Sequence, residues 1–139
     1  MEWCEDSVYI KQCEKAEEIQ TCWKLLKGDW FYNKVHRKIM VFPYSYSTLK
    51  QLELKIWLPR QDQLQEMIKH SDIYFWDLCK EPEGWLVLGR DVAEERIYPE
   101  DSLDGIKEKH YSNTAEQALI KAVMFKYNKV WNGKDWISS

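Results

Sequence analysis

The cysteines of this sequence recur at a spacing that raises the question of a metal site. Cys4, Cys13 and Cys22 are nine residues apart. On one helix, nine residues place Cys13 and Cys22 on opposite faces, about 13 Å apart along the axis. Two ligands so placed cannot hold one ion, and the sequence has no C-x-x-C pair, so we expect no metal site. We expect these cysteines and Cys79 to be reduced thiols in a cytosol.

The three histidines are the candidate general bases. His36, His70 and His110 stand among lysines, arginines or serines, which is typical of turns and helix ends. The sequence has no G-x-S-x-G, Walker loop or H-E-x-x-H motif. Catalysis needs a nucleophile with a base, a pair of carboxylates in different environments, or a metal. We therefore expect a binding protein without a cofactor rather than an enzyme.

Charge is divided along the chain more sharply than the net value of −3 suggests. The formal charge is +4 over residues 27–50, −6 over residues 77–108 and +3 over residues 109–139. Segregated charge of this kind favours binding by electrostatic complementarity.

The basic segment also carries aromatic residues. Cations bind phosphates and rings stack on bases, so this mixture is typical of sites for nucleotides or single-stranded nucleic acid. The candidate residues for this alternative function are Trp30, Tyr32, Lys34, His36, Arg37, Lys38 and Tyr44. The other interpretation is that alternate rings point into the core while the lysines solvate a hairpin turn.

The acidic segment favours a different partner, a protein with a basic surface. Tryptophan and arginine dominate the energetics of protein interfaces, and a ring at position 57 would lie on the polar side of an alternating strand. That ring must be covered by a second layer or left for a ligand. The candidate partner-binding residues are Trp57, Arg60, Glu94, Glu95, Asp101, Asp104, Trp131 and Trp136.

Periodicity predicts the elements that position these residues. A helix is expected over residues 7–26, with the apolar stripe Tyr9, Cys13, Ala16, Ile19, Trp23 and Leu26. Residues 29–42 are typical of a hairpin, residues 52–58 of a half-buried strand, and the segment after Pro59 of a short helix. A second hairpin is expected over residues 73–88, and residues 91–109 are expected to be mostly irregular.

The last expected helix begins with the capping box of Asn113 and Glu116 and runs to Trp131. It is apolar around most of its circumference, so a second element or a partner must cover its far side, and a homo-oligomer is one solution. Asn132-Gly133 then predicts a turn before Trp136. Together these elements predict one layered α+β domain over residues 1–139, with about three helices on a mainly antiparallel sheet of about five strands.

The start of the chain is acidic where a secretory signal would be basic, and no apolar run is long enough to span a bilayer. We therefore expect a cytoplasmic protein that does not enter a membrane.

Two blocks of the sequence resemble small phage and prophage proteins of Gram-positive bacteria. The first is Trp57-Leu-Pro-Arg-Gln-Asp-Gln-Leu-Gln-Glu66, and the second is Lys126-Tyr-Asn-Lys-Val-Trp-Asn-Gly-Lys-Asp-Trp136. The resemblance implies a phage or prophage origin and a layered α/β fold, but it implies no activity. It makes a host protein in the host cytosol the expected partner, and counter-defence an expected role.

Overall fold

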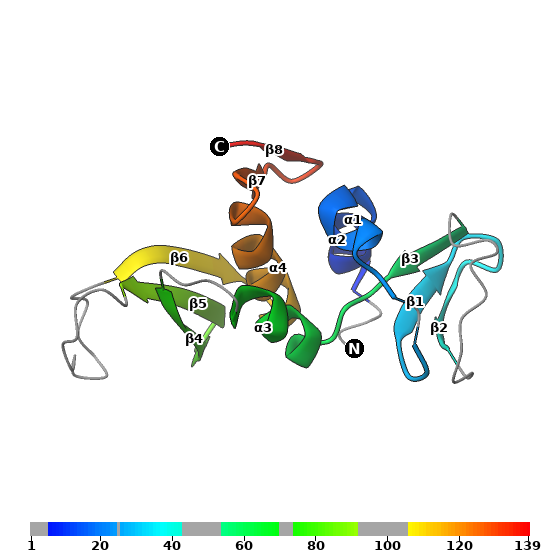
Figure 1. The fold of residues 1–139 in the computed structure, drawn as a ribbon, viewed down its shortest axis with the longest axis horizontal. Helices are drawn as coiled ribbons and strands as arrows, with labels where there is room; N and C mark the ends of the chain where they lie inside the picture. Colours follow the sequence, from blue (N-terminus) through cyan, green and yellow to red (C-terminus); the bar gives the residue numbers. More distant parts are fainter. Residues whose placement is uncertain (1–5, 25, 43–53, 70–73, 92–105) are drawn as a thin grey trace. The chain divides into compact units, whose positions relative to one another are not determined.

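A computed structural model describes residues 6–24, 26–42, 54–69, 74–91 and 106–139 of the chain (Figure 1). Backbone contacts divide the chain into two compact units, unit 1 (residues 1–60 and 124–139) and unit 2 (residues 61–123). The described residues form α1 (Ser7–Lys15), α2 (Glu17–Thr21), β1 (Trp30–Asn33), β2 (Lys38–Val41), β3 (Lys55–Trp57), α3 (Gln61–Lys69), β4 (Tyr74–Glu81), β5 (Gly84–Asp91), β6 (Ile106–Ser112), α4 (Ala115–Phe125), β7 (Lys129–Trp131) and β8 (Trp136–Ser138).

The strands form three small antiparallel sheets rather than one sheet of five strands. Their orders are β2-β1-β3, β4-β5-β6 and β7-β8. The α+β class and the antiparallel pairing are therefore confirmed, whereas the single sheet is wrong. Pro59 follows β3 and α3 comes next, so the chain leaves the first sheet before the second one begins.

In unit 1, the first predicted helix is broken into α1 and α2. Asp6 caps α1 by accepting hydrogen bonds from the backbone N–H groups of Val8 and Tyr9. Ala16 then leaves the helical conformation with ψ 75°, and the side chain of Gln20 donates to the Cys13 carbonyl at 3.1 Å. The predicted stripe is buried from Tyr9 to Trp23, but Leu26 is 58% exposed because α2 ends at Thr21.

The same Gln20 covers the outer edge of β3, beside which α1 and α2 lie in Figure 1. Its side chain accepts from the Trp57 N–H at 2.8 Å and donates to the Trp57 carbonyl at 3.0 Å. An unpaired strand edge is a site for unwanted pairing, and this amide occupies the edge at Trp57. The Tyr9 hydroxyl donates to the Pro59 carbonyl at 2.6 Å and fixes the exit of the strand.

In unit 2, the predicted hairpin of residues 73–88 is confirmed as β4 and β5. Strand β6 pairs with the free side of β5. The first four residues of β6, 106–109, lie in the segment that we expected to be irregular. We expected this because the sequence there is polar and has no apolar alternation. Val87 of the central strand is fully buried, and so is Leu64 of α3.

Helix α4 is capped one residue later than predicted. The Thr114 hydroxyl, rather than Asn113, accepts a hydrogen bond from the Gln117 N–H at 3.2 Å. The helix ends at Phe125 rather than at Trp131, because Asn128 takes the left-handed conformation with φ 60° and β7 follows. All residues from Ala115 to Met124 except Lys121 are buried, so the chain itself covers the apolar circumference of the helix.

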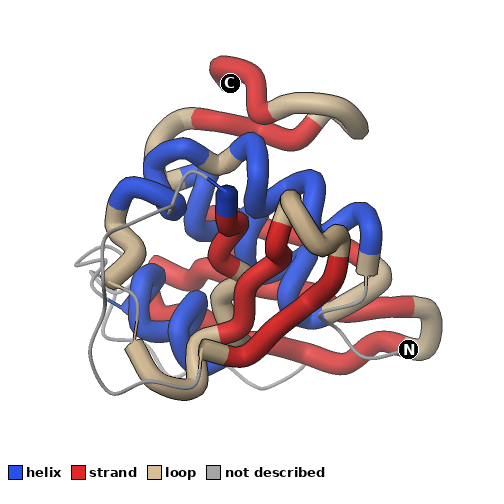
Figure 2. Tube along the Cα trace, turned by 90° about the vertical axis from the view of Figure 1, so that its right-hand side faces the viewer, coloured by secondary structure: helices blue, strands red, loops and turns tan. Residues whose placement is uncertain are grey.

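The predicted turn at Asn132-Gly133 is confirmed, and β7 and β8 lie side by side near the end of the chain marked C in Figure 2. The backbone N–H groups of Lys134 and of Asp135 each donate to the Asn132 side chain, and Gly133 has φ 100°.

Glu18 of α2 forms an ion pair with Lys129. Partial burial alone would raise the pKa of the Glu18 carboxyl, but the hydrogen bond and charge of Lys129 hold it below its ordinary value.

Among the described helices, none combines the length and the apolarity needed to cross a membrane.

Candidate functional site

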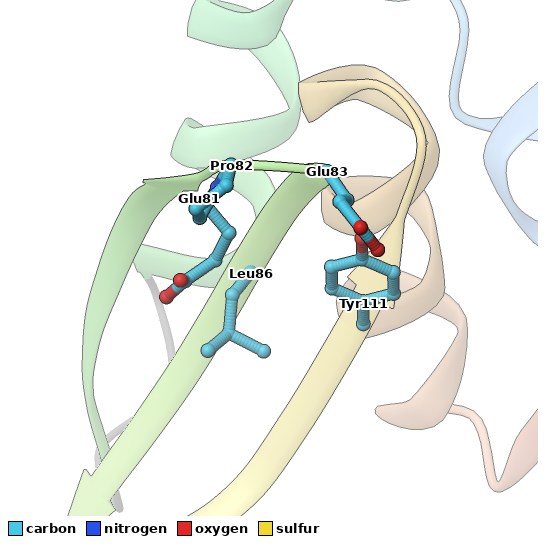
Figure 3. Close-up of a pocket in the computed structure, with 5 residues that line it drawn as sticks. All are labelled: Glu81, Pro82, Glu83, Leu86 and Tyr111. Carbon is cyan, nitrogen blue, oxygen red and sulfur yellow. The ribbon is translucent and has the colours of Figure 1, made fainter.

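A hollow of about 440 Å³ lies at the turn between β4 and β5, within unit 2. Its lining comes from the turn and from two paired strands, and consists of Glu81, Pro82, Glu83, Leu86 and Tyr111. The pairing of β5 with β6 places Leu86 directly opposite Tyr111. In Figure 3 the Glu83 side chain lies beside the Tyr111 ring, and the Glu81 side chain lies on the other side of Leu86. Two carboxylates therefore flank an apolar surface.

Because Gly84 has no side chain, the Tyr111 ring can lie close to the backbone at residue 84. A Cβ atom at residue 84 would lie 2.6 Å from the Tyr111 hydroxyl and 2.6 Å from the Ser112 carbonyl oxygen. The other side of Tyr111 is fixed by α4, because the Lys121 ammonium donates to the Tyr111 carbonyl at 2.9 Å. Burial lowers the pKa of Lys121. The position of the ring is therefore set by a glycine in one strand and a helix in the same unit.

Gly84→Ala is expected to displace Tyr111 and to destabilise unit 2 by about 1–3 kcal/mol, because the new methyl group meets a backbone oxygen that cannot move freely. Thermal unfolding would measure the loss, and the NMR signals of the Tyr111 ring would report its displacement. Gln65→Ala is the control, since it alters an exposed residue of α3 in the same unit that does not line the hollow. Equal stability and an unchanged Tyr111 spectrum in Gly84→Ala would contradict the packing described above.

The negative charge of the hollow is shared by unit 2 as a whole. Residues 61–123 carry 14 acidic and 7 basic side chains, a formal charge of −7. The remaining residues, those of unit 1, carry 9 acidic and 13 basic side chains, a formal charge of +4. Lys80 is the lysine nearest to the turn in sequence. Its ammonium is bound to the carbonyls of Glu81 and Gly84 and lies 5.4 Å from the centre of the Trp85 ring.

The described tryptophans predicted to bind a partner are packed within unit 1. Trp57 is 6% exposed and stacks on Trp23, with ring centres 6.0 Å apart. The second layer that its position required is therefore supplied by the chain itself. Trp136 is 8% exposed, donates from Nε1 to the Gln12 carbonyl, and lies 5.0 Å from the half-buried Trp131. Trp57 and Trp136 are thus core residues, which corrects their expected place on the surface.

Arg60 also has a role within unit 1. Its guanidinium donates to the Gly28 carbonyl at 3.0 Å and lies 3.6 Å from the buried Asp29 carboxylate. The predicted acidic residues Glu94, Glu95, Asp101 and Asp104 lie outside the described residues. The acidic residues that the structure does bring together, Glu81 and Glu83, belong to the same acidic segment. The Glu-Pro-Glu-Gly turn is the sequence signal that could have singled them out.

The basic and aromatic residues of the alternative site are partly exposed. Lys34, His36, Arg37 and Lys38 are exposed at the turn between β1 and β2, while Trp30 and Tyr32 are half-buried. Phe31 between them is buried, so one ring of this strand is in the core as expected, while its two aromatic neighbours are half-buried rather than on the surface. Tyr44 lies outside the described residues.

Among the described histidines, His110 lies within hydrogen-bond distance of a carboxylate. His110 Nε2 lies 2.6 Å from Glu108 Oε1, and both side chains are about nine-tenths buried. Because neighbouring strand residues point to opposite faces, this pair lies on the opposite face of the sheet from Tyr111 and does not reach the hollow. His36 is exposed and His70 lies outside the described residues.

The described thiols do not form a site. Burial raises the pKa of the Cys13 thiol far above its ordinary value, whereas Cys22 is exposed just after the end of α2. Within the described ranges, no three side chains of cysteine, histidine, aspartate or glutamate gather to hold a metal ion.

The hollow at the β4–β5 turn combines two carboxylates, a phenol ring and an apolar surface. This combination is suited to binding a cationic group.

No protein-family model, curated protein or solved structure matches this chain.

Proposed function

We propose that this protein acts by binding a protein partner, and that the hollow at the β4–β5 turn receives a basic side chain of that partner. The observation that carries this proposal is the arrangement of two carboxylates, Glu81 and Glu83, around Leu86 and the Tyr111 ring. An arginine or lysine has an apolar stem and a charged head. The stem would lie on Leu86, and the head would meet the carboxylates and the face of the ring.

The charge of the whole unit supports the same partner chemistry. A unit with a formal charge of −7 attracts a basic protein before contact and raises the association rate at low salt. The hollow would then provide the specific contact within a broader field. The resemblance to phage and prophage proteins makes a host protein in the host cytosol the proposed partner, and counter-defence the proposed role.

The experiment is a titration of the full-length protein with an arginine-rich peptide, followed by NMR signals of the Leu86 methyl groups and the Tyr111 ring. We expect those signals to shift in a saturable manner. The double variant Glu81→Lys/Glu83→Lys should weaken binding at least about tenfold, since both attractive charges become repulsive.

The matched control is Asp62→Lys/Glu66→Lys, which makes the same change in charge at two exposed positions of α3 in unit 2. We expect it to weaken binding much less than the hollow variant does. Equal weakening by both variants, or peptide binding without shifts at Leu86 and Tyr111, would show that the hollow is not the site.

A further inference from the structure

The end of the β1–β2 hairpin in unit 1 holds three basic residues in the turn and a fourth, Lys38, at the start of β2. We define Lys34, His36, Arg37 and Lys38 as the cationic tip; all four are exposed. The Asn33 side chain accepts hydrogen bonds from the N–H groups of Val35 and His36, at 2.9 and 3.1 Å. The Arg37 N–H donates to the Asn33 carbonyl at 2.8 Å, and Arg37 has φ 53°. The tip is therefore ordered by its own backbone before any ligand binds.

The sheet adds a further cation from another strand. Asn33 is opposite Lys38 on one side and opposite Lys55 on the other. Residues that are directly opposite in a sheet point to the same face, and adjacent strands are about 4.8 Å apart. Lys38 and Lys55 thus flank Asn33 at the end of the sheet, next to the tip. Lys55 also lies over the Phe31 ring, 5.8 Å from its centre.

Most of the local charge is positive. Residues 30–42 and 54–59 contain four lysines and arginines and no aspartate or glutamate, and the next cation, Arg60, is paired with Asp29. Lys34 lies 3.8 Å from Glu14 of α1, but both side chains are more than 40% exposed. An exposed ion pair of this kind contributes little and can exchange for another anion. The chemistry of the tip therefore favours a ligand with several negative charges in a row.

The rings of β1 favour one class among such polyanions. Trp30 and Tyr32 point to the opposite face of the sheet from the buried Phe31, and both are half-buried rather than enclosed. Bases of single-stranded nucleic acid stack on aromatic rings while lysine and arginine hold the phosphates. A purely anionic sugar polymer has no base to stack.

We propose that the cationic tip binds the phosphate backbone of single-stranded nucleic acid where the nucleic acid passes over the end of the sheet. Tyr32, which points to the opposite face of the sheet from Lys38 and Lys55, then stacks on a base. This goes beyond the proposed protein-binding function, because it uses unit 1 and none of the residues that line the hollow. The two sites can therefore be tested separately.

The experiment measures the affinity of the full-length protein for a labelled oligothymidylate of about 16 nucleotides by fluorescence anisotropy, at salt concentrations between about 50 and 200 mM. We expect affinity to fall as salt rises. The triple variant Lys34→Gln/Arg37→Asn/Lys38→Gln should weaken binding at least about tenfold and lower the slope of log affinity against log salt by about 2. Asparagine is chosen at residue 37 because it tolerates the left-handed conformation.

The matched control is Lys11→Gln/Lys24→Gln/Lys126→Gln, which removes the same charge from three exposed lysines of unit 1. An equal loss in this control would show a general charge effect and overturn the proposal, as would the absence of binding at low salt. Tyr32→Leu should weaken oligothymidylate binding at least about fivefold but leave heparin binding unchanged. If Tyr32→Leu has no effect and heparin competes equally, the ligand is not a nucleic acid.

Discussion

Trp57→Ala is expected to lower the free energy of unfolding by about 3–5 kcal/mol, because it removes a large ring from the core of unit 1. The Trp57 ring is nearly parallel to that of Trp23, with an angle of 2° between the planes, and Trp23 also contacts Phe31 at 6.2 Å between ring centres. The cavity left by the ring would face two other aromatic residues. Chemical denaturation followed by far-ultraviolet circular dichroism would measure the loss.

Trp57→Phe separates the packing of the ring from its polar atom. The Nε1 atom of Trp57 is buried without a hydrogen-bond partner among the described residues. Phenylalanine fills part of the volume and removes this donor, so the expected loss is only about 1 kcal/mol. Trp30→Ala is the control on the opposite face of the sheet, where the ring is half-buried and its removal should be less harmful than that of Trp57. If Trp57→Ala is no more destabilising than Trp30→Ala, Trp57 is not a core residue.

The same ring shows how far the sequence predicts the fold. The alternation of residues 52–58 places Trp57 on the polar side of its strand, so a covering layer or a ligand was predicted there. The cover is Trp23, a residue 34 positions earlier in the chain. Periodicity describes one element at a time, so it cannot say which distant element completes a layer.

Local signals predicted most of the elements, and the errors lie where local signals conflict or are absent. The apolar stripe runs on through Ala16, so periodicity alone could not show that the helix breaks there. In the last helix, the apolar pattern continues past Phe125, but Asn128 adopts the left-handed conformation and ends it. Strand β6 has a polar sequence, Lys107-Glu-Lys-His110, and is recognised only through its pairing with β5.

The sequence singled out the acidic segment as a whole but not the residues that line the hollow. The acidic segment was expected to meet a basic partner, and the two carboxylates of the hollow belong to it. The ring that completes the hollow comes from Tyr111, whose position depends on the register between β5 and β6. Register between strands that are not joined by a short turn depends on long-range packing, so a single sequence gives little information on it.

Asp29→Ala is expected to destabilise the protein by about 3 kcal/mol, because the Asp29 carboxylate is a buried acceptor shared by several donors. One oxygen accepts from Trp23 Nε1 at 3.1 Å and from the Leu26 N–H at 2.9 Å, and the other faces the Arg60 guanidinium. The backbone of Asp29 also pairs with that of Phe42 at the start of the β1–β2 hairpin. Removing the carboxylate leaves two donors unpaired beside the stacked tryptophans. Urea denaturation at neutral pH would measure the change.

Asp29→Asn distinguishes the hydrogen bonds from the charge. Its amide oxygen can still accept from Trp23 and Leu26, but it no longer attracts Arg60, whose side chain is 35% exposed. A partly exposed ion pair contributes about 1 kcal/mol or less, so Asp29→Asn should retain most of the stability that Asp29→Ala loses. Arg60→Met, made both in the unsubstituted protein and in Asp29→Asn, completes a double-mutant cycle. The cycle measures the coupling between Asp29 and Arg60 directly. Equal losses in Asp29→Asn and Asp29→Ala, together with strong coupling to Arg60, would show that the ion pair rather than the hydrogen bonds holds this part of unit 1 together.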